Sequence, residues 1–245
     1  MDGWIRNHTH RETVSGVMKR LREVVTFAKG LVQFVKDPAD VGSLRDMQVS
    51  LERLASPADM EKALQVFRSA EGFSELLAHR YQAPKWEREN LSHFAEGTLG
   101  HAVYQFMVEN DLARESLNIP QNESDIGYLR RRGQETHDIW HTVVGYGTDI
   151  LGELGLHSFL MGNFFRCIKS ERAGSSAFIV VIEVGLLAHI FIYRPRLIPQ
   201  SLTGAVAGLR RGWTASPMWA VRWEEMWSRP LSEVRAQHLG SAHRA

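Results

Sequence analysis

Apolar residues along the chain recur at the spacing of an amphipathic α-helix, and no segment alternates strictly between apolar and polar residues as a half-buried strand would. In SPADMEKALQVFRSA, for example, Met60, Leu64 and Phe67 fall on one helical face. Ser56 and Pro57 give this segment the N-cap residue and the first-turn proline that are typical of a helix start. The pattern therefore predicts an all-α protein, folded as a single multi-helix domain.

Similar signals mark several other segments as helices. In KDPADVGSLRDM, Asp37 is the expected N-cap residue, because Pro38 follows it at the first helical position and Asp40 lies three residues after it. Further helices are predicted over residues 96–110, 124–144 and 148–169, with a short one opening at Pro230. Residues 118–124, NIPQNES, are predicted to form a loop.

The most apolar segment is AFIVVIEVGLLAHIFIY, residues 177–193. It is shorter than the roughly 20 residues that cross a bilayer, and it carries Glu183 and His189. A carboxylate within a lone membrane-spanning helix is costly. The segment is therefore interpreted as a buried helix or as one wall of an apolar cavity.

Composition narrows the class of protein without identifying it. Of the 245 residues, 44% are hydrophobic and 23% are charged, and the formal net charge is +1, which argues against a nucleic-acid-binding protein. The single cysteine, Cys167, cannot form an intramolecular disulfide, and no secretory signal is recognised, so a reducing compartment is expected. A metal site in this chain would have to use His, Asp and Glu.

Such residues are concentrated in HDIWHTVVGYGTDILGE. His137 and His141 lie four residues apart, so they share one helical face, and Asp138 lies three residues before His141 on the same arc. Glu153 would point about 120° away from His141 if the helix were continuous. The Gly-Tyr-Gly break argues against a continuous helix, and a second helix capped by Thr148 or Asp149 would bring Glu153 back toward the histidines.

Spacing alone leaves three interpretations of this stretch: a metal site, a dyad of a nucleotide phosphohydrolase built on His137-Asp138, or a polar face of an ordinary helix. The phosphohydrolase needs a further Asp downstream, and the chain has none after Asp149. His157, four residues after Glu153, is either a neighbour of the site or a structural residue. The metal site and the ordinary helix remain open on spacing alone.

The stretch resembles the signature of the coenzyme Q biosynthesis protein 4 family: His-Asp-x-x-His, eleven residues, then Glu. EGTLGHAVYQFM, KDPADVGSLRDM and AVRWEEMWSRPLSEVRAQHLG are also similar to segments of that family. The resemblance implies one all-helical domain over residues 31–240, after an extension (1–30) and before a tail (241–245). It also implies an internal hydrophobic tunnel for a polyprenyl chain, with a metal site at its mouth.

By that resemblance, His137, Asp138, His141 and Glu153 are the expected ligands of a divalent metal and the expected catalytic residues. Zinc is the usual assignment, and two imidazoles with carboxylates suit iron as well. Arg130 lies seven residues before His137 on nearly the same helical face, and it is considered as a contact for an anionic substrate group. The alternative for Arg130 is a solvated basic turn.

The function implied is ubiquinone biosynthesis, through metal-dependent, oxidative decarboxylation of a polyprenylated hydroxybenzoate. The rival is a non-catalytic scaffold that binds the prenylated lipid and presents it to other ubiquinone-biosynthesis enzymes. The resemblance also implies a peripheral position on the inner face of a membrane, cytoplasmic or on the matrix side of a mitochondrion, and a homodimer is kept open. Arg194 and Arg196 at the end of the apolar segment, with Arg210 and Arg211 later, could face anionic headgroups, although scattered arginines more often only aid solubility.

Overall fold

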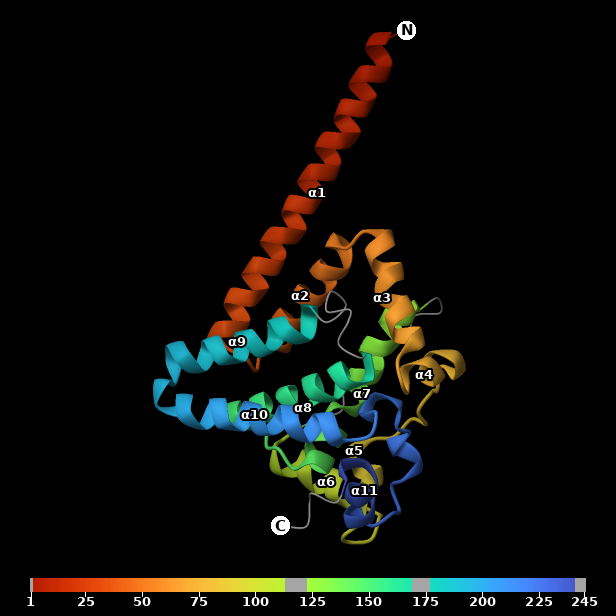
Figure 1. The fold of residues 1–245 in the computed structure, drawn as a ribbon, viewed down its shortest axis with the longest axis vertical. Coiled ribbons are helices and arrows are strands. Elements are labelled where there is room, and N and C mark those ends of the chain that lie inside the picture. Colours follow the sequence, from red (N-terminus) through yellow and green to blue (C-terminus); the bar gives the residue numbers. More distant parts are fainter. Residues whose placement is uncertain (1, 113–122, 169–176, 241–245) are drawn as a thin grey trace.

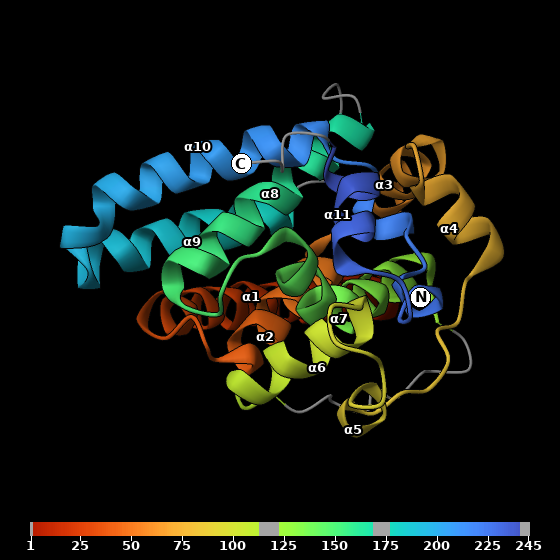
Figure 2. The same cartoon turned by 90° about the horizontal axis from the view of Figure 1, so that it is seen from below.

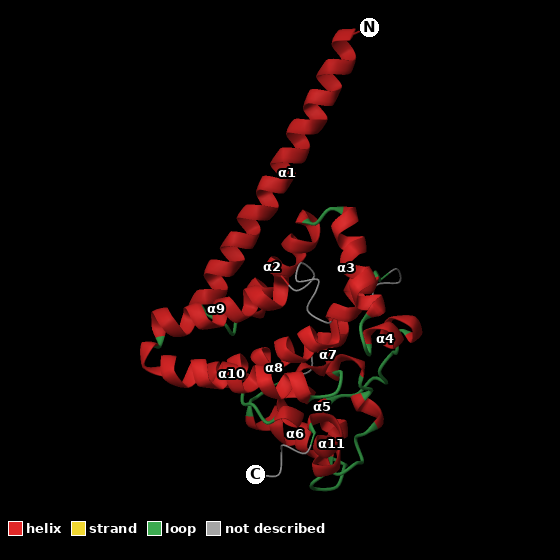
Figure 3. Cartoon of the chain, viewed as in Figure 1, coloured by secondary structure: helices red, strands yellow, loops and turns green. Residues whose placement is uncertain are grey.

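The computed structural model describes residues 2–112, 123–168 and 177–240. Within these ranges the structure contains helices and no β-strands (Figures 1 and 3). This confirms the predicted all-α class. The α-helices are α1 (Asp2–Lys36), α2 (Val41–Leu54), α3 (Pro57–Ser69), α4 (Phe73–His79), α5 (Arg88–Leu91), α6 (Leu99–Glu109), α7 (Asp125–Val144), α8 (Ile150–Ile168), α9 (Ala177–Tyr193), α10 (Ile198–Thr214) and α11 (Leu231–Leu239). Three short 3₁₀ helices are η2 (Pro195–Leu197), η3 (Met218–Ala220) and η4 (Trp223–Glu225).

Most helix starts follow the local signals in the sequence. The Ser56 side chain accepts a hydrogen bond from the Asp59 amide, and Pro57 is the first residue of α3, as predicted. Ser124 caps α7 in the same way, and α11 begins directly after Pro230. The predicted helix over 177–193 is α9. These starts are local because the groups that satisfy the free helical amides lie within three residues.

The prediction for Asp37 was wrong. Helix α1 runs on to Lys36, and residues 37–39 form the turn that follows it, in which Asp37 accepts a hydrogen bond from the Ala39 amide. The N-cap residue of α2 is Asp40, whose side chain accepts from the Ser43 amide.

Two other predicted helix bounds also shift. Helix α6 begins at Leu99 rather than at residue 96, because Thr98 provides its N-cap. Helix α8 begins at Ile150, two residues later than predicted. The other end predicted for α8, residue 169, lies outside the described residues, as do residues 118–122 of the predicted loop and the tail 241–245.

The tightest contact between helices joins α8 and α10. A Cβ atom on Gly212 would lie 1.9 Å from the Phe159 carbonyl oxygen, and one on Gly162 would lie 2.2 Å from the Leu209 carbonyl oxygen. The two backbones can approach this closely only because glycine stands at these positions. Figure 2 shows α10 alongside α8 and α9, with α1 and α2 on the other side of α9.

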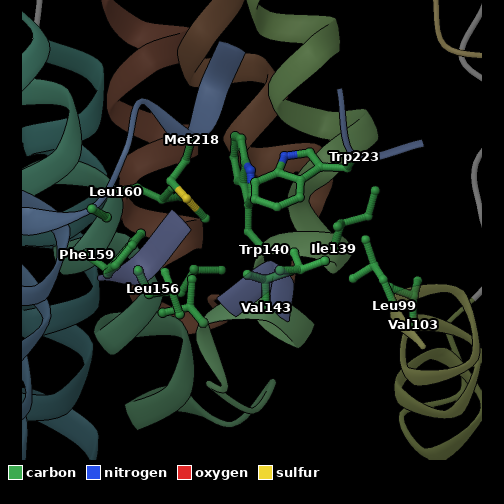
Figure 4. Packing of buried hydrophobic residues seen from close by; sticks show 14 of the residues in the cluster. Leu99, Val103, Ile139, Trp140, Val143, Leu156, Phe159, Leu160, Met218 and Trp223 are labelled. Atoms are coloured by element: carbon green, nitrogen blue, oxygen red, sulfur yellow. The ribbon is translucent and has the colours of Figure 1, made fainter. Parts of the chain in front are cut away.

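Helix α7 is held in the largest apolar core. Trp140 of α7 and Trp223 of η4 are both almost fully buried there, and Met218 packs in the same cluster (Figure 4). Leu156 and Phe159 of α8 line the same cluster. Helix α7, which carries the two motif histidines, is thereby packed against both α8 and the segment of η3 and η4.

Helix α1 is the exception to this packing, because it extends well beyond the rest of the molecule (Figure 1). Its C-terminal part packs on α2, where Gly30 lies close to Met47, and on α9, where Gly185 lies close to Phe34. In the part of the chain that the structure describes, no single helix has the length and apolar character needed to cross a bilayer; α9 and α10 meet that test only jointly and are bent by 118°.

Candidate metal centre

Two imidazoles meet on one face of α7. His137 and His141 lie one helical turn apart, and their ring centroids are 4.7 Å from each other. The His137 side chain is 36% exposed, whereas that of His141 is 1% exposed. Phe106 of α6 stacks on the His141 ring at 5.4 Å and covers it from the other side. The pair therefore has one buried and one accessible member.

The Gly-Tyr-Gly break ends α7 and lets the chain turn into α8. Gly145 has a φ of 83°, in the left-handed region, and its amide donates to the His141 carbonyl. Asp149 then opens α8, because its side chain accepts from the amides of Leu151 and Gly152. Gly152 has no side chain to obstruct this turn, and a Cβ atom there would lie 2.1 Å from the Gly147 carbonyl oxygen.

The turn places Glu153 against both histidines. Its Oε1 lies 3.2 Å from His141 Nε2, and its Oε2 lies 3.9 Å from His137 Nε2. One donor atom from each of these three residues lies within 4.8 Å of the other two, which is close enough for all three to hold one metal ion. The break in the helix thus brings Glu153 to the two histidines, as we expected from the sequence.

The hydrogen bonds of His141 fit a cation at this point. His141 Nδ1 lies 3.1 Å from the Tyr146 carbonyl oxygen, so Nδ1 carries the hydrogen and donates it. Nε2 is then left with a lone pair, is buried without a hydrogen bond, and faces the Glu153 carboxylate. Two acceptors that face each other across 3.2 Å need a positive charge between them, which either a proton or a metal ion supplies.

The pKa values of Glu153 and His137 also indicate a site that attracts positive charge. Burial alone would raise the pKa of Glu153, but His141 and His137 lower it below its ordinary value, which keeps the carboxylate ionised. Burial would lower the pKa of His137, but Asp138 and Glu153 together raise it above its ordinary value. The site is therefore a place where negative charge attracts a proton or a metal cation.

Asp138 lies beside this cluster rather than within it. Its Oδ1 is 3.7 Å from His137 Nδ1, on the side of the ring away from the Nε2 atom that faces Glu153. It is not one of the three residues whose donor atoms converge. Its predicted role as a fourth ligand stays a prediction.

Arg130 lies on α7 and is paired with another helix. Its guanidinium donates to Glu52 of α2 at 2.7 Å, and both side chains are about 30% exposed. The predicted contact between Arg130 and an anionic substrate stays a prediction.

Three further groups lie near the centre, and of these only His157 had been considered as a neighbour of the site. The Tyr146 carbonyl orients His141, and Tyr146 itself packs under the guanidinium of Arg211 at 5.1 Å. His157 lies 6.4 Å from His137 between ring centroids, and burial together with the charge of His137 lowers its pKa to about 4. The spacing of His157 from Glu153 indicated its place. The Tyr146 carbonyl contact is local to the turn after α7, whereas the contact of Tyr146 with Arg211 joins segments whose packing the sequence does not specify.

Helices α10 and α11 each contribute an arginine that binds the C-terminal end of α7. Arg235 of α11 donates to the carbonyls of Thr142 and Val143. Arg211 of α10 donates to the carbonyl of Val144. Both arginines therefore bind the carbonyls that α7 leaves free directly after His141.

These features define an all-helical protein with a cluster of two histidines and one carboxylate at a helix–turn–helix junction. Residues 52–240 match the family model of "Coenzyme Q (ubiquinone) biosynthesis protein Coq4". The chain belongs to this family, as the resemblance of its motifs implied.

Individual relatives agree with the family match. The chain is similar to proteins named "Ubiquinone biosynthesis protein COQ4 homolog, mitochondrial" from Danio rerio, with 28% identity over 67% of this chain and 58% of the relative, and from Anopheles gambiae, with 24% identity over 78% and 65%. The chain thus spans less than two-thirds of the length of these curated relatives. A crystal structure from Nostoc punctiforme PCC 73102 shares the fold, with a TM-score of 0.72 and 22% identity over 89% of this chain and 98% of that one.

Proposed function

We propose that this chain acts in ubiquinone biosynthesis as a metal-dependent enzyme that removes the ring carboxylate of a polyprenylated hydroxybenzoate. Membership of the Coq4 family supports the pathway, and relatives carry its name. One observation carries the metal-dependent part: His141 Nε2 is buried without a hydrogen bond and faces the Glu153 carboxylate, with His137 beside it.

The donor set supports a divalent metal. Two imidazoles and a carboxylate are ligands of zinc in catalytic sites and of Fe(II) in non-haem oxygenases. A bound cation would supply Lewis-acid stabilisation of the negative charge that develops on the substrate. Zinc serves a plain decarboxylation, whereas the oxidative reaction requires a redox metal such as iron or another oxidant.

The geometry favours an enzyme over a scaffold with a structural metal. Structural zinc sites are closed by four protein ligands, while catalytic sites use three and keep a position open. Three side chains converge here, and Asp138 lies to one side. His137 and Glu153 are partly exposed and His141 is buried behind them, so a substrate would approach from the side of His137 and Glu153.

Further parts of the proposal rest on the family resemblance. They are a hydrophobic tunnel for the prenyl chain, a domain spanning residues 31–240, contact of Arg130 with the substrate carboxylate, Asp138 as a fourth ligand or as a partner of His137, association with other enzymes of the pathway and a position on the inner face of a membrane. Arg130 can contact substrate only by leaving Glu52. If Arg130→Ala leaves substrate affinity unchanged, that contact is removed from the proposal.

Release of carbon dioxide tests the activity. The purified chain is loaded with Zn²⁺ or Fe²⁺ and given a short-chain prenyl hydroxybenzoate, with and without dioxygen. We expect the wild-type chain to release carbon dioxide. The His141→Ala variant should lose both the bound metal and the release of carbon dioxide. His79→Ala is the matched control, because His79 is exposed on α4 and bonds only a carbonyl of its own helix. Retained lipid without carbon dioxide release, under any metal or oxidant, would favour the scaffold.

A further inference from the structure

The turn after α7 is joined to His141 by two hydrogen bonds. The Tyr146 amide donates to the His141 carbonyl at 3.2 Å, and His141 Nδ1 donates to the Tyr146 carbonyl at 3.1 Å. The backbone of His141 therefore holds the turn, and the turn in return holds the imidazole ring. The direction of Nε2, which faces the Glu153 carboxylate, depends on where the Tyr146 carbonyl stands.

The side chain of Tyr146 reaches two other helices. Its ring packs directly on α8 at Gly155, where a Cβ atom would lie 2.5 Å from Tyr146 Cε1. The guanidinium of Arg211, from α10, lies over the same ring at 5.1 Å from its centroid. Helices α8 and α10 lie alongside each other (Figure 2), so the ring is held by two helices that are themselves in close contact. Because Gly155 follows Glu153 by two residues, Tyr146 contacts both parts of the chain that supply donor atoms.

Arg211 makes a second contact with the same turn. Its Nη2 donates to the Val144 carbonyl at 2.8 Å, two residues before Tyr146. A guanidinium is planar, so it can donate hydrogen bonds from its edge while its face stacks on an aromatic ring. Arg211 thus holds both the backbone and the aromatic side chain of the turn against α10.

We infer that Arg211 is a positioning residue of the candidate metal centre, which acts through Tyr146 to keep His141 Nε2 directed at Glu153. The inference deepens the proposed function and rests on it for the role of the metal. Without the guanidinium, the Tyr146 ring can leave its place on α8, and the carbonyl that holds Nδ1 moves with it. Removing a group that orients a ligating imidazole typically weakens metal binding by about 10–100-fold.

Arg235 provides a comparison at the same helix end. It donates to the carbonyls of Thr142 and Val143, next to the carbonyl that Arg211 binds. Among the described residues, its hydrogen bonds go to these carbonyls and not to Tyr146. If Arg211 served only to bind the free carbonyls of α7, the loss of Arg235 should therefore disturb His141 in the same way.

The Nδ1–H signal of His141 tests the inference in the metal-free full chain. Proton–nitrogen NMR shows an imidazole N–H when a hydrogen bond protects it from exchange with water. We expect this signal in the wild type and its loss in both Arg211→Ala and Tyr146→Ala. Arg235→Ala should keep the signal, and so should Tyr146→Phe, which retains the ring and the carbonyl. Circular dichroism checks that each variant is folded.

Titration calorimetry with Zn²⁺ tests the consequence for the metal. Arg211→Ala and Tyr146→Ala should each bind Zn²⁺ about tenfold more weakly than the wild type, whereas Arg235→Ala and Tyr146→Phe should bind as the wild type does. Because Arg211 acts through the tyrosine ring, the double variant Arg211→Ala/Tyr146→Ala should bind no more weakly than either single variant.

Three results would overturn the inference. They are the absence of the Nδ1–H signal from the wild type, its retention in Arg211→Ala, and its loss in Arg235→Ala as well. Additive losses of Zn²⁺ affinity in the double variant would also contradict it, because Arg211 would then act independently of Tyr146. If the wild-type chain binds no divalent metal, the proposed function fails, while the Nδ1–H signal still decides whether Arg211 positions His141.

Discussion

Arg132 of α7 and Glu224 of η4 form a fully buried ion pair that ties the helix of the two motif histidines to the segment after α10. They are 92 residues apart in sequence, and the guanidinium of Arg132 donates to both carboxylate oxygens of Glu224, at 2.5 and 2.9 Å. Both side chains are inaccessible to solvent. Helix α7 also receives hydrogen bonds near its other end from Arg211 of α10 and Arg235 of α11. The part of the chain from α10 onward therefore holds this helix at two places.

Glu224→Gln should therefore destabilise the protein strongly. Removing the charge of Glu224 leaves Arg132 with only the more distant carboxylate of Glu135, at 3.8 Å, and breaking a buried pair costs about 3–5 kcal/mol. Urea unfolding measures the change. Glu225→Gln is the control, because Glu225 is exposed and lies 3.6 Å from an exposed Arg222; its effect should stay within about 0.5 kcal/mol. Similar losses in the two variants would contradict the role of the buried pair.

Glu183 should make stability depend on pH. It is buried in α9, where one oxygen accepts a hydrogen bond from Ser158 and the other has no partner. Burial raises the pKa of Glu183 to about 6, whereas an unfolded chain has a Glu pKa of about 4.3. The folded protein thus holds this proton more tightly, so the free energy of unfolding contributed by Glu183 falls as pH rises from about 4 to about 6, and is level above that.

Glu183→Gln removes the charge that costs stability at neutral pH. We expect the variant to be more stable than wild type by about 2 kcal/mol near pH 7. The advantage should become small near pH 4, where Glu183 is protonated in the folded state and mostly protonated in the unfolded state. Urea unfolding at the two pH values checks this, and Glu96→Gln, at an exposed carboxyl, should show no such difference. A glutamine variant that is less stable than wild type near pH 7 would refute the argument.

The contact between α8 and α10 should tolerate no side chain at Gly212. Gly212→Ala would place a Cβ atom 1.9 Å from the Phe159 carbonyl oxygen, so the helices must separate. Overpacking of this kind costs about 1–3 kcal/mol or more. Gly204→Ala on the same helix meets nothing within 4 Å and should instead stabilise α10 by about 0.5–1 kcal/mol. Thermal unfolding distinguishes the two, and equal effects would contradict the close contact.

Gly145→Ala should weaken metal binding as well as the fold. A left-handed φ of 83° costs a residue with a side chain about 1–2 kcal/mol, and relaxation of this turn would move Glu153 away from the histidines. Gly97→Ala is the control, because Gly97 also has a positive φ, of 80°, with open space around it. Both variants should lose stability, but only Gly145→Ala should lose affinity for Zn²⁺ in titration calorimetry.

Local features of this fold could be predicted from the sequence. The caps at Ser56 and Ser124 and the break at Gly145 each depend on residues a few positions apart. Asp37 was chosen wrongly because Pro38 favours it locally, although Asp40 is an equally good capping residue, and the choice between them depends on where α1 ends.

Partners from distant segments could not be predicted. Helical spacing puts Arg130 on the face of His137, but it does not reveal that Glu52, 78 residues away, pairs with Arg130. Spacing puts Asp138 on the arc of the histidines and Glu153 off it unless the helix breaks, whereas the placement of α8 brings Glu153 into the cluster and leaves Asp138 beside it. The convergence of three donors, rather than four, required the packing of two helices.

The glycine contact has a consequence for the metal centre. Helix α8, which carries Glu153, is locked against α10, while both histidines belong to α7. A slip of α8 by one residue along its axis, about 1.5 Å, would carry the carboxylate out of reach of the buried imidazole nitrogen. If the proposed site binds a divalent metal, its affinity should therefore depend on the register between α7 and the α8–α10 pair. Substitutions that shift this register should change that affinity even from the far end of either helix.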